Sequence, residues 1–591
     1  MKQNNLIKGL NSWRAKSVNE DLFFIILSII IGLITGLAAA LMKTAVIFIK
    51  DNILNNISEG SNSIILFLVP IIGISITVIF IHHIIKDPKN HGIYGILMSL
   101  SQRKGRIRRE KSISAFFGGI LTSAFGGSAG LESPIISTGT SISSAISAKF
   151  NLNIKQTSLL LGCGAAAAMS GIFFTPIASI IFVVEVLVID LTANSIIPLL
   201  IASISAAIIS NAVMPSEVVF QFNFIEQIGF SQFPFLIFLG IISGMMSLYF
   251  KRVTFAIHRK MQSYNTALTR LVIGASILGL LIYLFPALYG EGYDTLKLII
   301  QGDASDITDI SFLYAYKDEF WILMLIMLIV AFLKVVSTTL TIESGGVGGF
   351  FAPSVFTGGL LGYIFSSVIN YVSPNWHLSV KEYTVVGMAG VMAGVMHAPL
   401  TAIFFAAEIT QGYILIFPLM IVATISFVTS RYFEPQSVFT KYMADEGEVL
   451  SHHKDKTVLH LLTIKSVMDT DLTTIPSTIT LKEFTKYVSE ATRNVFPVVG
   501  NNNEFIGIVD FGDVRKVIFD KDKYNNKITD YMMHPKTFVS TSDKMETAME
   551  KFNETGYYNM PVIDDGIYKG FISRSNTFSA YRKLLIAVSQ D

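Results

Sequence analysis

The chain has 591 residues, of which 51% are hydrophobic and only 15% are charged. Soluble domains carry about 25% charged residues, so this deficit predicts a chain that is largely solvated by lipid. The net charge of +2 does not favour a nucleic-acid partner. The single Cys163 excludes an internal disulfide framework and a metal site built from several thiolates.

Residues 22–42 form an uncharged run that is long enough to span a hydrocarbon core of about 30 Å. The apolar part of a secretory signal is shorter, about 7–15 residues, so we predict a first membrane span here. Residues 1–21 are then expected to be a cytoplasmic N-terminal segment. The basic residues that favour this side are Lys2, Lys8, Arg14 and Lys16.

Further apolar segments follow along the chain, and several are too short, or too interrupted by Gly and Pro, to be simple spans. This pattern is typical of re-entrant and discontinuous helices, which must be buried in protein or line a cavity. Basic residues follow the second span, which agrees with a cytoplasmic N-terminus. We expect a multi-pass protein of the plasma or inner membrane with both termini cytoplasmic. The segments are about 22–49, 64–85, 113–148, 155–190, 195–213, 232–257, 268–289, 319–341, 353–371, 383–410 and 413–433.

The membrane part contains an internal repeat. The pattern GxxxPxxxTG occurs at 130–139 and again at 349–358, an offset of 219 residues. Two Pro-to-Glu segments, 176–185 and 399–408, match at an offset of 223 residues. Repeats of this kind are typical of transporters whose site lies at the repeat interface. An old duplication without a shared site is the alternative, and the sequence does not show whether the repeats are inverted.

Each GxxxP element predicts a helix that opens inside the membrane. Glycine lets the backbone approach a ligand, and Pro suits the first helical turn. The free N–H groups and the positive end of the helix dipole then form an anion site without a full positive charge, from which an ion can still leave quickly. The alternative is that small residues merely allow close helix packing.

Glu132 lies inside the first of these elements. An ionisable group at membrane depth is costly, which makes it a functional candidate. Its carboxylate can occupy the anion's place and block the path, then leave when it is protonated or displaced. Glu185 and Glu408 end apolar helices and are expected to cap or anchor those helices.

These residues resemble the CLC family of chloride channels and proton/chloride antiporters, over about residues 22–441. Residues 126–134, GGSAGLESP, resemble the family's GxxGREGP element, and residues 344–353, SGGVGGFFAP, resemble its GxFxP element. The resemblance implies two internally repeated helical halves, about 22–213 and 232–441, and a homodimer. It makes Glu132 the gating glutamate and assigns chloride binding to the backbone N–H groups of Phe350 and Phe351.

The chain departs from the family pattern at several anion-binding positions. Residues 90–94, NHGIY, occupy the place of GSGIP, so His91 replaces the chloride-coordinating Ser next to Gly92. Ser133 replaces a Gly beside Glu132, which leaves a backbone role intact. Phe439 falls where the family has a Tyr, so a coordinating hydroxyl is lost.

A further departure concerns protons. Antiporters of the family often have paired glutamates at the end of the helix that corresponds to 176–185, and the second glutamate is the inner proton acceptor. This chain has Glu185 followed by Val186, which cannot carry a proton.

After about residue 441 the composition becomes charged, which predicts a soluble α/β tail. We expect a linker over 442–460 and a repeated module over 461–591, with copies at about 461–520 and 525–590. The two copies resemble a tandem pair of CBS domains. The resemblance suggests adenine-nucleotide binding, with Asp513 as the ribose ligand and Asn576 at the matching place in the second copy. A purely structural dimerisation module is the alternative.

We therefore expect chloride transport gated by Glu132, most simply as channel-like conduction. A proton-coupled chloride antiporter is the alternative, and a CBS-regulated cation transporter, which would need acidic rings in its pore, is less favoured. No Ser/His or metal-ligand pair has suitable spacing in the apolar segments, so neither an enzyme nor a metal site is expected, and no cofactor is required.

Overall fold

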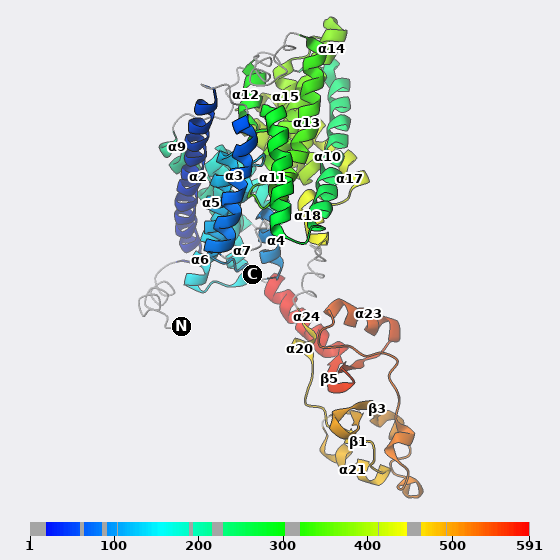
Figure 1. The fold of residues 1–591 in the computed structure, drawn as a ribbon. Coiled ribbons are helices and arrows are strands. Elements are labelled where there is room, and N and C mark those ends of the chain that lie inside the picture. The colour runs from blue at the N-terminus through cyan, green and yellow to red at the C-terminus, as the bar shows by residue number, and fades with distance from the viewer. Residues whose placement is uncertain are drawn as a thin grey trace. The chain divides into compact units, whose positions relative to one another are not determined.

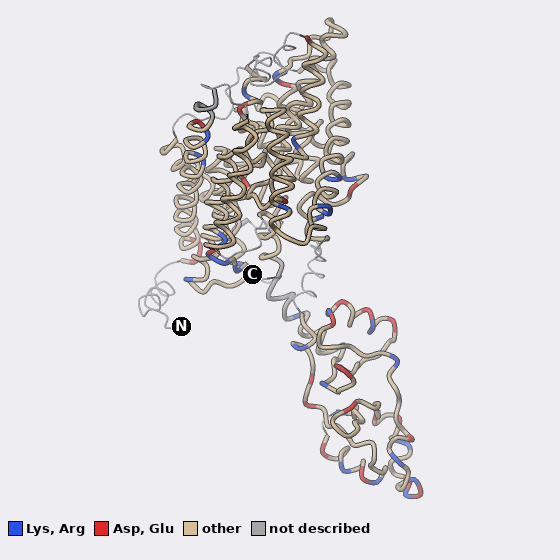
Figure 2. Tube along the Cα trace, in the orientation of Figure 1, with Lys and Arg blue, Asp and Glu red and all other residues tan. Residues whose placement is uncertain are grey.

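The structure is a computed structural model that describes residues 19–58, 64–85, 92–102, 105–187, 193–214, 228–301, 319–411, 413–445, 462–491 and 493–589. The chain divides into two compact units, Met1–Val449 and Leu450–Asp591. Most of the N-terminal segment, His91 and most of the predicted linker lie outside the described residues. Figure 2 shows few charged residues along the helices of the first unit and many on the second.

The first unit is a bundle of helices (Figure 1). Its first half contains α2 Glu20–Ser58, α3 Ile64–Ile79 with a π-helical end Phe80–Ile85, α4 Gly92–Gln102, α5 Glu110–Ala124, α6 Glu132–Phe150, α7 Ile154–Phe173, α8 Pro176–Glu185 and α9 Ala193–Val213. Its second half contains α10 Phe233–Gln262, α11 Ala267–Leu284, α12 Tyr293–Gln301, α13 Phe320–Glu343, α14 Phe351–Val372, α15 Val380–Met396, α16 Pro399–Ile409, α17 Ile416–Phe433 and α18 Val438–Asp445.

Among the described residues, nine helices are long and apolar enough to cross a membrane. The helices α8 and α16 are apolar but shorter, as expected for discontinuous segments. Both begin with a Pro in the first turn, where its missing N–H is no loss. The predicted polytopic helical fold is therefore confirmed.

The two repeats have opposite orientations at the points where they meet. Gly130 and Gly349 form an antiparallel bridge, with N···O distances of 3.1 and 2.9 Å. The helices α8 and α16 also pack in opposite directions, because the end of each reaches the start of the other. The structure thus decides what the sequence left open: these paired elements are inverted.

Glu185 and Glu408 do act as helix caps, but each caps the helix of the other repeat and not the helix that it ends. Glu185 accepts the N–H groups of Leu400 and Thr401 at 3.1 and 2.7 Å. Glu408 accepts the N–H groups of Ile177 and Ala178 at 3.0 and 2.8 Å. A carboxylate at a helix N-terminus satisfies free donors and complements the helix dipole.

The glycine of each TG pair lies at an equivalent helix crossing. A Cβ on Gly139 of α6 would overlap the carbonyl of Gly164 in α7, and a Cβ on Gly358 of α14 would overlap that of Gly387 in α15. The repeated glycines therefore allow α6 and α7, and α14 and α15, to approach backbone to backbone.

The second unit has two similar halves. The first contains α20 Ile464–Val467, β1 Ile475–Pro476, α21 Leu481–Glu490, β2 Val495–Val499, β3 Phe505–Asp510 and α22 Phe511–Val514, and the second contains α23 Met545–Thr555, β4 Asn559–Asp564, β5 Ile567–Ser573 and α24 Arg574–Ser589. The strands β1 and β2 are parallel, whereas β2–β3 and β4–β5 are antiparallel. Asp469 forms an antiparallel bridge with Phe571 of β5, and Ile508 of β3 forms one with Met533, so a strand of each half pairs with residues of the other half.

We predict that Gly358→Ala lowers the stability of the folded protein by about 1–3 kcal/mol, because the new methyl group must push α14 away from α15. Thermal unfolding of the detergent-purified protein measures this. Gly229→Ala is the control, since the nearest atom to its Cβ is 3.8 Å away. Equal unfolding temperatures for the two variants would contradict the close crossing.

We also predict that Glu185→Gln destabilises the protein by about 1–3 kcal/mol, because it removes charge-assisted hydrogen bonds to the start of α16. Glu319→Gln is a matched control, since Glu319 is exposed at the start of α13 and makes no side-chain cap. The same unfolding experiment distinguishes them, and an unchanged midpoint for Glu185→Gln would refute the capping role.

Candidate functional site

Two helix starts meet at the centre of the first unit. The Gly130–Gly349 bridge places the first residue of α6, Glu132, beside the first residue of α14, Phe351. Both residues are fully buried. Glycine is required here, because a Cβ on Gly349 would overlap the Glu132 carboxylate.

Glu132 points its side chain at the other helix start. Its Oε1 accepts the N–H of Phe351 at 2.8 Å. This N–H belongs to the first turn of α14, which has no intrahelical partner for it and carries the positive end of the helix dipole. The carboxylate thus occupies a place that is suited to an anion.

A third helix start, that of α4, joins the site through Ser133. The Ile93 N–H donates to Ser133 Oγ at 3.3 Å. Gly92 has a φ of +51°, and a Cβ there would overlap Ser133 Oγ, so both its conformation and its surroundings require glycine.

A cavity of about 410 Å³ leads to these helix starts. We call it the Ser133 cavity. Of the sequence-predicted anion-binding residues, it is lined by Gly92, Ser133, Phe350 and Phe439, while Phe351 and Glu132 lie buried beside it. His91 lies outside the described residues. Phe439, in α18, presents an aromatic ring to the cavity and no hydroxyl.

Val186 is buried directly after α8, and its N–H donates to the Phe182 carbonyl at 2.9 Å. It does not line the Ser133 cavity. The neighbouring Glu185 carboxylate is engaged at the start of α16.

Two ionisable residues near Glu132, one half-buried and one fully buried, were not identified as site residues in the sequence analysis. Glu291 Oε1 accepts the N–H of Leu131, the residue before Glu132, at 2.7 Å. Lys334 is fully buried in α13, donates to the Gly290 carbonyl at 2.7 Å, and lies 4.9 Å from the centre of the Phe356 ring. A lone Lys within an apolar helix is a signal that could have identified Lys334.

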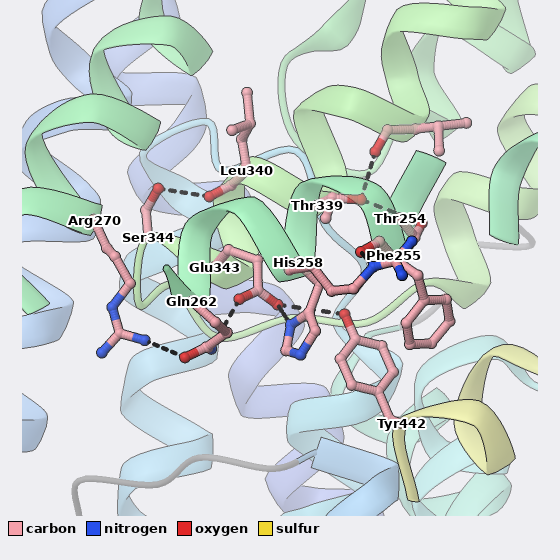
Figure 3. Close-up of polar contacts among 12 residues, drawn as sticks. Thr254, Phe255, His258, Gln262, Arg270, Thr339, Leu340, Glu343, Ser344 and Tyr442 are labelled. Carbon is pink, nitrogen blue, oxygen red and sulfur yellow. Dashed lines mark hydrogen bonds and ion pairs between the residues drawn. The ribbon is translucent and has the colours of Figure 1, made fainter. Parts of the chain in front are cut away.

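A network of polar side chains also borders the Ser133 cavity (Figure 3). Glu343, at the end of α13, pairs with His258 Nδ1 at 2.7 Å. Tyr442 and Gln262 donate to its two oxygens, each at 3.3 Å, and Arg270 donates to Gln262 at 2.7 Å. The sequence analysis did not identify this network, because its members are far apart in the chain.

In the second unit, Asp513 and Asn576 occupy matching places. Asp513 lies in α22 directly after β3, and Asn576 lies in the first turn of α24 directly after β5. Asp513 is exposed and Asn576 is partly buried.

Comparisons with known proteins agree with this architecture. Residues 72–431 match the family model "Voltage gated chloride channel", and residues 464–520 and 528–583 match the CBS domain model.

Three curated relatives illustrate the range of the family. The chain is 26% identical to chloride channel protein CLC-e of Arabidopsis thaliana, in a match that covers 68% of this chain and 59% of that one. It is 28% identical to a putative chloride channel protein, ClcB-like, of Ralstonia nicotianae, covering 58% and 76%. It is 25% identical to the H(+)/Cl(-) exchange transporter ClcA of Vibrio campbellii, covering 70% and 87%.

Solved structures are also similar. A slow cyanobacterial Cl-/H+ antiporter has a TM-score of 0.62 at 21% identity, with coverage of 73% of this chain and 99% of that one. A CLC-type fluoride/proton antiporter has a TM-score of 0.59 at 25% identity, and the match covers 71% of this chain and 97% of that one. A eukaryotic CLC transporter has a TM-score of 0.59 at 15% identity, and the match covers 94% of this chain and 98% of that one. The chain belongs to the voltage-gated chloride channel (CLC) family and carries a tandem pair of CBS domains after its membrane unit.

Proposed function

We propose that this protein moves chloride across a membrane through a pathway gated by Glu132, and that the movement is channel-like, without proton coupling. The observation that carries the proposal is the hydrogen bond from the Phe351 N–H to the Glu132 carboxylate. A tethered anion fills the donor site at the start of α14. When it leaves, a free chloride can take its place.

The electrostatics of the site favour transport over tight binding. The donors next to Glu132 are backbone groups at helix starts, with partial rather than full charges. Such a site attracts an anion and still releases it. A cation pathway would need several carboxylates, and Glu343 is the one Asp or Glu among the described residues that line the Ser133 cavity.

The absence of coupling is inferred from Val186 and Glu185. The family resemblance places the inner proton acceptor at Val186, which has no titratable group. Glu185 is occupied as a helix cap. These two residues leave the end of α8 without a carboxylate that is free to shuttle protons.

Proton-coupled antiport is the second candidate. It is favoured by the retained Glu132 and by the similarity, at 25% identity, to proteins named as an H(+)/Cl(-) exchange transporter and as a fluoride/proton antiporter. Proton movement against its gradient distinguishes the two modes.

We predict that proteoliposomes with the wild-type protein release chloride without driving protons uphill. Glu132→Gln should raise chloride flux about threefold or more, because a neutral amide competes less well than a carboxylate for the Phe351 N–H. A chloride electrode and a pH electrode measure both ions, and Glu319→Gln is the matched control.

If the wild-type protein drives protons uphill and Glu132→Gln abolishes this movement, the proposal of channel-like conduction is wrong and antiport takes its place. Absence of chloride flux in both proteins would overturn chloride transport itself. Reversal potentials in asymmetric chloride and pH provide an independent measure of coupling.

We further propose a plasma or inner membrane location with both termini in the cytoplasm, and a homodimer as the resemblance implies. The orientation is supported by basic residues that gather where α5 and α11 begin and α10 ends. They are Arg106, Arg108, Arg109, Arg259, Lys260 and Arg270.

For the CBS pair we propose a single adenine-nucleotide site that uses Asp513. A carboxylate can accept hydrogen bonds from both ribose hydroxyls, whereas the Asn576 amide offers one neutral acceptor oxygen. Charge-assisted hydrogen bonds are about twice as strong as neutral ones.

We predict that Asp513→Ala weakens ATP binding to the full-length protein about tenfold or more, and that Asn576→Ala changes it little. Isothermal titration calorimetry with ATP and AMP measures this. No heat of binding to the wild-type protein, or equal losses in the two variants, would contradict the assignment.

A further inference from the structure

The Ser133 cavity holds one acid–base pair that the gating mechanism does not use. Glu343 is 5% exposed at its side chain and His258 is 17% exposed, and their contact is 2.7 Å. Gln262 and Tyr442 hold the same carboxylate from α10 and α18. Three side chains from two helices therefore hold the Glu343 carboxylate at the wall of the cavity (Figure 3).

The other charged or titratable groups that face this cavity include no second Asp or Glu among the described lining residues, and Glu132 lies buried beside the cavity. Among the described lining residues these are His82 of the π-helical end of α3, Arg270 of α11, and the tyrosines Tyr94 and Tyr442 of α4 and α18. Arg270 reaches Glu343 only through Gln262. Lys441, beside Tyr442, pairs instead with Glu434 at 3.0 Å.

We propose that His258 and Glu343 form a proton-controlled electrostatic barrier to chloride in the Ser133 cavity. When His258 is protonated, the pair has no net charge. When the proton is lost, the pair carries one negative charge, which repels a chloride ion that approaches Ser133 and Phe350. The identity of the ion rests on the proposed function, whereas the barrier does not depend on whether transport is coupled.

The dimensions of the cavity make this single charge effective. A volume of about 410 Å³ keeps any ion inside it within about a Debye length of Glu343, so salt screens the interaction weakly. Low-dielectric walls focus the field further. The sign is set by the pair: a higher pH removes the proton and slows chloride, and a lower pH restores the flux.

The test measures chloride flux from proteoliposomes that have the same pH on both sides, at about pH 5.5 and about pH 8.5, on either side of the ordinary histidine range. All variants are made in the Glu132→Gln background, because this removes titration of the gate itself. Equal pH on both sides removes any need to orient the protein. In this parent, we expect flux at the lower pH to be about threefold or more above flux at the higher pH.

Two substitutions should abolish this ratio in opposite directions. Glu343→Gln removes the repelling charge, so flux should remain high at both pH values. His258→Gln keeps a donor for Glu343 but cannot take up a proton, so flux should remain low at both. The second variant also preserves the packing of the network, which keeps the test valid if Glu343→Gln does not fold.

His82→Gln and Glu20→Gln are the controls. His82 is a second histidine that lines the same cavity and is not part of the Glu343 network, and Glu20 is an exposed acid at the start of α2 that does not line the cavity. Both should keep the parent's ratio.

Three results would overturn the role of the pair. The parent could show no pH dependence of chloride flux, or the ratio of flux at low pH to flux at high pH could stay unchanged in both Glu343→Gln and His258→Gln. The third is that His82→Gln abolishes this ratio. Absence of chloride flux in the parent and in the wild type would instead overturn the proposed function, and with it the ion assigned to the barrier.

Discussion

The reciprocal backbone hydrogen bonds between Gly130 and Gly349 are the contact on which the rest of the site depends. They join the two chain segments that open α6 and α14, so two inverted repeats present their helix starts to one point. Neither helix start would suffice alone, because a single dipole end is a weak anion site. A side chain on Gly349 would displace Glu132, so the same glycines that form the bridge also leave space for the Glu132 carboxylate.

Charged side chains inside the membrane unit are stabilised by hydrogen bonds to backbone groups of distant segments. Glu185 accepts backbone N–H groups at the start of α16, and Glu408 accepts those at the start of α8. Lys334 donates a hydrogen bond to the Gly290 carbonyl. Buried charges without such partners are strongly destabilising. In the two Pro-to-Glu segments these partners come as a pair, because each segment supplies a helix start and the carboxylate that caps the other start.

The departures from the family pattern change the chemistry at two places, the Ser133 cavity and the end of α8. Phe439 brings no hydroxyl to the path, and Val186 brings no proton acceptor to the end of α8. Ionisable side chains occur instead at the wall of the cavity, where Glu343 and His258 are in contact. In this protein, control of the ion path would then depend on the net charge of that pair and on the position of Glu132, rather than on a hydroxyl at the cavity.

The sequence by itself determined the class of the protein, the repeat, and the residues at its centre. Hydrophobic run lengths, the two GxxxPxxxTG elements and Glu132 are local patterns, so they could be interpreted without coordinates. Only the tertiary structure decided that the repeats are inverted, that Glu185 and Glu408 cap each other's partner helix, and that Glu343 contacts His258 and Tyr442. These contacts join residues between 85 and 231 positions apart. No local pattern specifies such contacts, because they arise only when the helices pack around the bridge at Gly130 and Gly349.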